Sequence, residues 1–129
     1  MRIASGRRSL LFATVAVLLC SVMAGAGTDA PAVAQGELVE TYCWTAMQLG
    51  GVAHASCGIE CAKRGIPVAV DDRKAHTVYV LLPPRDKSSL PPALIAQMGR
   101  LVTIRGDAFT KGGSHFLLVK EWQPTPAAR

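Results

Sequence analysis

The chain has 129 residues, with 14 Lys and Arg against nine Asp and Glu, which gives a formal net charge of +5. About the first quarter reads as an export leader, so the remainder holds only one small domain, which excludes most large enzyme architectures. The basic residues are few and scattered, which argues against a nucleic-acid partner.

Residues 1–34 are typical of a secretory signal peptide, with arginines at the start, an apolar run over 10–23, and Ala32 and Ala34 just before Gln35. The apolar run is shorter than the roughly 20 residues of a membrane helix. Three basic residues and one acidic residue lie in this leader, so eleven basic and eight acidic residues remain, a net charge of +3. We therefore predict a periplasmic or secreted protein with no membrane span in the mature chain.

The pattern after the leader predicts five short strands and two short helices. The strands are expected over residues 37–44, 66–70, 77–82, 101–109 and 114–122, and the helices over residues 54–64 and 93–98. One helix is inserted after the first strand, and the other precedes the last hairpin. This order is typical of a mainly β, five-stranded OB-fold-like barrel, which we place at residues 35–123 with a disordered tail at 124–129.

Alternation and turn residues underlie these predictions. Tyr42 and Trp44 alternate with polar residues at the end of the first strand. Polar residues 71–74 and glycines 112–113 separate the strands of the two hairpins, and Gly65 follows the first helix as a stop signal.

Three cysteines and one histidine of the mature chain form the most informative pattern. His54, Cys57 and Cys61 are spaced by three and four residues, so a helix places their side chains on one side. Cys43 at the end of the first strand completes a Cys3His set, which is typical of structural zinc sites. Thiolates with one imidazole also suit Cu(I). The sequence thus predicts a copper or zinc site formed by Cys43, His54, Cys57 and Cys61.

A disulfide is the alternative interpretation of the same cysteines. In an oxidising compartment, Cys43 would pair with Cys57 or Cys61, staple the inserted helix to the barrel and leave one spare thiol. The protein would then be a disulfide-stabilised OB-like interaction module that binds a protein or glycan partner in the periplasm.

The sequence contains no nucleophile elbow, phosphate loop or haem-attachment motif, so we assign no catalytic residue. We expect a non-enzymatic barrel whose Cys/His cluster binds a thiophilic metal or acts as a redox-sensitive staple.

One resemblance extends over nearly the whole mature chain. It is carried by Cys43 on a strand, by the His-x-x-Cys-x-x-x-Cys run at 54–61, by Gly-Ile-Pro at 65–67, and by the later strand pairs with residues 101–106. The chain resembles a group of small exported bacterial proteins without an established function. That resemblance implies a compact barrel and carries no catalytic assignment.

Overall fold

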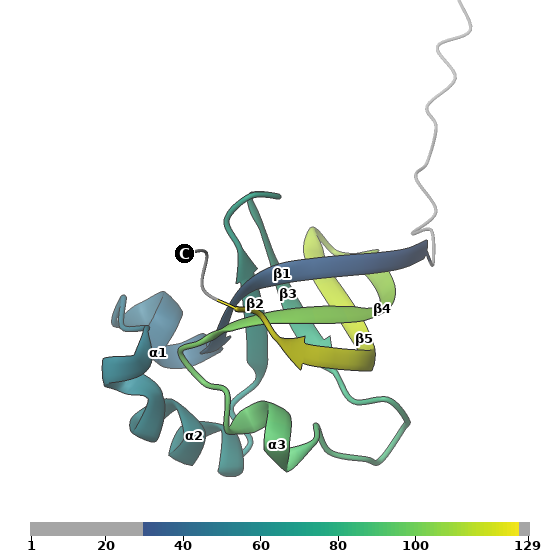
Figure 1. Ribbon diagram of the computed structural model, residues 1–129. Coiled ribbons are helices and arrows are strands. Elements are labelled where there is room, and N and C mark those ends of the chain that lie inside the picture. Colours follow the sequence, from purple (N-terminus) through teal and green to yellow (C-terminus); the bar gives the residue numbers. More distant parts are fainter. Residues whose placement is uncertain (1–29, 127–129) are drawn as a thin grey trace, which may run out of the picture.

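The computed structural model describes residues 30–126 and shows a closed barrel of five strands (Figure 1). The strands are β1 (Ala30–Glu40), β2 (Val68–Asp72), β3 (Thr77–Leu82), β4 (Leu101–Lys111) and β5 (Ser114–Pro124). They follow one another around the barrel in the order β1, β2, β3, β5, β4, with β4 closing on β1. Only β3 and β5 pair in parallel among these strands. The predicted mainly β, five-stranded barrel is confirmed.

Both predicted hairpins are present. The β2–β3 hairpin turns over residues 73–76, two residues later than predicted, because Asp71 and Asp72 end β2 and pair with β3. The β4–β5 hairpin turns at Gly112 and Gly113, which have φ values of 58° and 79°. A two-residue hairpin turn with positive φ at both positions is matched to the twist of the strands and favours glycine. Near its middle, this hairpin has a β-bulge between Arg105 and Gly106, a device that bends a strand and aids closure of a barrel.

Apolar side chains from every strand fill the barrel. Residues at alternate positions of a strand point to the same face, and the inward face here carries the aliphatic residues. The largest fully buried side chains are Leu38, Val70, Leu94, Val102, Ile104 and Leu117. Burial of this apolar surface is the main favourable contribution to folding.

The helices lie together at one end of the barrel (Figure 1). The insertion between β1 and β2 contains α1 (Thr41–Ala46), the 3-10 helix η1 (Val52–His54) and α2 (Ala55–Lys63), and α3 (Pro92–Ile95) precedes β4. The two predicted helices therefore correspond to η1 with α2 and to α3. None of the helices in residues 30–126 is long and apolar enough to cross a membrane.

The prediction that the first strand continues to residue 44 is wrong. β1 ends at Glu40, and Cys43 lies in α1 instead of on a strand. The reason is local: the Glu40 carboxylate accepts hydrogen bonds from the backbone N–H groups of Tyr42 and Cys43 and so caps the first helical turn. The backbone N–H of Thr41 donates to the carbonyl oxygen of Pro67, at 2.9 Å.

The predicted leader and tail lie mostly outside the described residues. Residues 1–29 are not described, whereas residues 30–34 form the start of β1 and pair with β4. At the other end, Pro124 is the last residue of β5, and the N–H of Thr125 donates to the carbonyl oxygen of Leu101 at 2.9 Å. The leader and the tail stay predictions.

Candidate metal centre

Three short elements at one end of β1 carry the predicted ligands. Cys43 comes from α1 and is 4 % exposed. His54 is the last residue of η1, and Cys57 and Cys61 lie on α2. The structure thus brings the four residues that the sequence singled out into one cluster, which we call the Cys/His cluster.

The ligand atoms form two overlapping triads. In the first, Cys43 Sγ, a ring nitrogen of His54 and Cys57 Sγ all lie within 4.8 Å of one another. In the second, Cys43 Sγ, Cys61 Sγ and a carboxylate oxygen of Glu40 lie within the same distance. Cys43 belongs to both triads, so it is the centre of the cluster.

Glu40 is the member that the sequence analysis missed. Its side chain is buried, at 2 % exposure, and caps α1 while lying beside the thiols. An acidic residue three positions before Cys43 would have been a cap signal if residues 41–46 had been predicted as helical. Because they were predicted as a strand, Glu40 had no recognised role.

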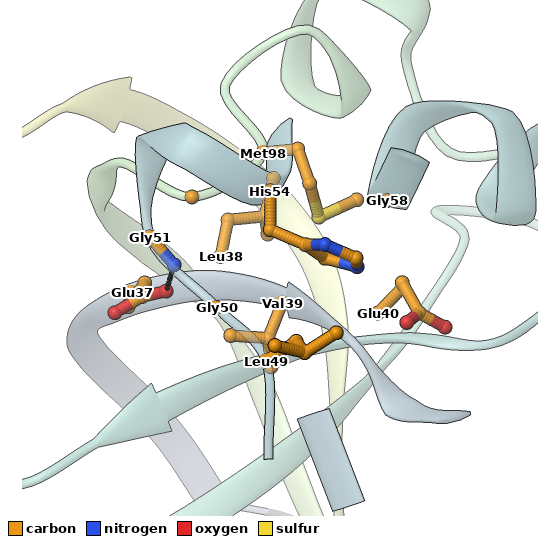
Figure 2. A pocket seen from close by; sticks show the side chains of 11 residues that line it. Glu37, Leu38, Val39, Glu40, Leu49, Gly50, Gly51, His54, Gly58 and Met98 are labelled. Carbon is orange, nitrogen blue, oxygen red and sulfur yellow. Dashed lines mark hydrogen bonds between the residues drawn. The ribbon is translucent and has the colours of Figure 1, made fainter. Parts of the chain in front are cut away.

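His54 carries an unusual buried atom. Its Nε2 is the only buried side-chain nitrogen or oxygen in residues 30–126 that has no hydrogen-bond partner. Figure 2 shows its ring directed between the side chains of Met98 and Glu40. The hollow there has a volume of about 10 Å³, room for one water at most. Most buried polar atoms in proteins are paired, so this nitrogen calls for an explanation such as an ion or a water.

Packing of α2 against β1 holds His54 and the cysteines in place. Gly58 is buried at this contact, and a Cβ atom added there would lie 2.7 Å from Met98 Cγ and 3.5 Å from Glu40 Cγ. Glycine therefore permits the close approach of α2 to the residues that line the cluster.

The three cysteines of the described chain are free thiols. The predicted disulfide between Cys43 and Cys57 or Cys61 is not formed in this structure and stays a prediction about the oxidised protein. Because Cys43 Sγ lies within 4.8 Å of the other two sulfurs, both pairings need only local movement.

Neighbouring groups keep two of these thiols protonated. A hydrogen bond with Glu40, together with burial, raises the pKa of Cys43 to about 12 from its ordinary value of 9.0. Burial has the largest effect on Cys61 and raises its pKa, and the neighbouring Cys57 raises that pKa further. A cation that binds here must therefore displace protons, as metals that bind thiols do.

Access to the cluster is through α2. Cys57 is exposed and Cys61 is half-buried, whereas Cys43 is buried. The cluster thus combines a solvent-accessible thiol with a buried thiol and with a histidine that has a buried ring nitrogen. Such a set can receive a cation from solution and enclose it.

No protein-family model, curated protein or solved structure matches the chain. The resemblance to small exported bacterial proteins therefore stays a prediction.

Proposed function

We propose that the protein is a non-enzymatic, exported barrel that binds one thiophilic metal ion, zinc or copper(I), in its Cys/His cluster. The observation that carries this proposal is the buried Nε2 of His54, which has no hydrogen-bond partner and belongs to a residue grouped with the thiols of Cys43 and Cys57. A neutral imidazole nitrogen is a common metal ligand, and its burial without a partner is costly unless something binds it.

The donor set suits both metals. Three thiolates and one imidazole form the Cys3His set of closed zinc sites, and the same soft donors select Cu(I). Cys43, His54, Cys57 and Cys61 would hold the ion, and Glu40 would orient Cys43 through its hydrogen bonds to the α1 backbone. The bound ion would supply positive charge to a cluster that lacks it.

Metal binding would have a structural consequence. The ligands come from α1, η1 and α2, so an ion would tie this insertion to the end of the barrel. The same thiols could serve as a redox-sensitive staple, because oxidation to a disulfide would remove two ligands from the ion. Both roles concern binding and stability, and neither requires a catalytic residue.

Metal content and affinity test the proposal. The protein purified from cells that export it should contain about one zinc or copper ion per chain. The double variant Cys57→Ser, Cys61→Ser should contain none. His54→Gln should weaken zinc or Cu(I) binding by at least about tenfold in competition with a chromophoric chelator. His115→Gln is the matched control, because His115 is exposed on β5 and remote in sequence from the Cys/His cluster.

Two results would contradict the proposal. The first is metal-free protein with three reduced thiols that binds neither Zn²⁺ nor Cu(I). The second is equal metal affinity for His54→Gln and the parent protein, which would show that His54 is not a metal ligand.

An interaction module is the second candidate function. Four exposed apolar side chains lie close together in sequence within the insertion: Tyr42 at 60 %, Met47 at 55 %, Leu49 at 41 % and Val52 at 66 % exposure. Exposed apolar patches mark surfaces that bind partners. A partner protein that binds this surface should bind the triple cysteine-to-serine protein equally well and bind Leu49→Ser less well. If the triple cysteine-to-serine variant alone loses partner binding, that binding belongs to the metal-dependent function instead.

A further inference from the structure

A second hollow lies between α2 and α3, separate from the Cys/His cluster. Its walls are Ile59 and Ala62 of α2, Ile95 of α3 and Ala96 directly after α3, and the buried residues Val68 and Leu81 form its floor. We call it the α2–α3 groove. Figure 1 shows α2 and α3 at the same end of the barrel, and both contribute side chains to the groove.

The groove and the Cys/His cluster use different sides of α2. On a helix with 3.6 residues per turn, Cys57 and Cys61 lie on one side, whereas Ile59, Ala62 and Lys63 are turned well away from it. The groove is therefore an independent feature, and a ligand there would not compete for the thiols.

Size and lining are those of a small-molecule site. The groove has a volume of about 510 Å³, within the range of about 300–1,000 Å³ that ligand pockets occupy. Its side chains are mainly aliphatic, so it favours an apolar ligand. Ile59 and Ile95 are only half-buried, which leaves apolar surface in the walls for a ligand to cover.

One charge and one hydroxyl stand among these apolar side chains. Lys63 is the only charged residue among the described residues that line the groove, and Ser89 adds a hydroxyl. Lys63 Nζ is 2.9 Å from Glu60 Oε1, but their side chains are 63 % and 59 % exposed, so this ion pair is weak and easily exchanged. An ammonium and a hydroxyl are donors, and a carboxylate is the acceptor that both prefer.

We propose that the α2–α3 groove binds a linear aliphatic carboxylate, a free fatty acid. The chain lies between Ile59 and Ile95 over the floor of the groove, and the carboxylate accepts from Lys63 Nζ and Ser89 Oγ at its rim. The ammonium thereby exchanges the Glu60 carboxylate for that of the ligand.

Titration with sodium decanoate tests the site, by calorimetry and by the backbone amide shifts of the labelled protein. Decanoate should bind and shift amides of α2, α3 and residues 89–90. Octanoate and hexanoate should bind progressively more weakly, by up to about fourfold for each methylene removed. 1-Decanol, which lacks the charge, should bind more weakly than decanoate.

Two pairs of variants separate the charge from the groove. Lys63→Gln should weaken decanoate binding by up to about fivefold and leave 1-decanol unchanged. Its control, Glu60→Gln, breaks the same ion pair but keeps the ammonium, and should bind decanoate as well as the parent or more tightly.

Ala96→Phe fills the groove and should abolish binding of both probes. Its control, Ala93→Phe, changes an exposed residue of α3 that does not line the groove, and should bind normally.

Each contrary result has a distinct meaning. No binding of decanoate, or amide shifts elsewhere on the barrel, would overturn the site. Equal affinity of Lys63→Gln and the parent for decanoate would overturn the carboxylate as the recognised group. Unchanged binding by Ala96→Phe would place the chain outside the groove. All of these outcomes are independent of the metal content of the protein.

Discussion

His54 is a residue whose chemistry conflicts with its surroundings unless a ligand is present. Its Nε2 is buried without a hydrogen-bond partner, beside the side chains of Met98 and Glu40. An unsatisfied buried polar atom costs about 1–3 kcal/mol, and an apolar residue of similar size avoids that cost. Replacement of His54 by an apolar residue should therefore raise the stability of the metal-free protein and lower its affinity for the metal.

The variant His54→Leu tests this opposition. In the presence of a chelator, its free energy of unfolding should exceed that of the parent by about 1 kcal/mol, measured by urea denaturation. Its zinc or Cu(I) affinity should fall, and added metal should no longer stabilise it. His115→Leu, at an exposed position, should change the free energy of unfolding by less than about 0.5 kcal/mol and leave metal binding intact. A metal-free His54→Leu protein that is less stable than the parent would show that His54 is an ordinary packing residue.

Among the elements, the insertion between β1 and β2 departs most from what the sequence predicts. Alternating aromatic residues at 42 and 44 indicated a strand, yet the buried Glu40 carboxylate caps a helix there. The strand preference of this alternating pattern was outweighed by the side-chain hydrogen bonds of the cap, which stabilise the helix more strongly because they are buried. α2 was predicted correctly, because its spacing and the Gly65 stop signal are local and agree with each other.

A single substitution where α2 packs against Met98 and Glu40 should move the metal ligands apart. In Gly58→Val, the new side chain would meet Met98 and Glu40, since even a Cβ atom lies 2.7 Å from Met98 Cγ. Overpacking of this kind costs about 1–3 kcal/mol, and it should displace α2 from Cys43. We expect a lower melting temperature and weaker metal binding.

Ser56→Val is the matched control for Gly58→Val. Ser56 is exposed on the same helix, so this variant adds a β-branched residue without a packing conflict and should cost only a few tenths of a kcal/mol. Equal effects of the two variants on metal affinity would assign the loss to a β-branched side chain anywhere on α2 instead of to the clash with Met98 and Glu40.

At the scale of the whole molecule, the element order after the insertion was predictable. Each hairpin has its own turn signal, and the number and order of strands leave few ways to close a small barrel. The convergence of Cys57 and Cys61 with His54 followed from helical spacing. The α2–α3 groove could not be predicted, because Ile59, Leu81 and Ile95 come from three distant segments that only the closed barrel brings together.

The closed barrel also bears on where the predicted leader ends. A leader that ends at Ala34 would remove the first five residues of β1, which pair with β4 from Ala30 opposite Ala108 to Ala34 opposite Ile104. Ala34 is 1 % exposed and belongs to the core. Loss of this segment would expose an unpaired edge of β4 and open the barrel at its seam.

We therefore predict that the mature protein starts at or before Ala30. The sequence offers an earlier small-x-small pattern at residues 24–26, which would leave all of β1 in place. Intact mass of the protein recovered after export should give the N-terminus directly, and Gln35 as the first residue would contradict the prediction. In a paired comparison, a chain that starts at Gln35 should unfold with a free energy lower by about 2 kcal/mol or more than one that starts at Ala30, because it loses buried surface and several strand hydrogen bonds.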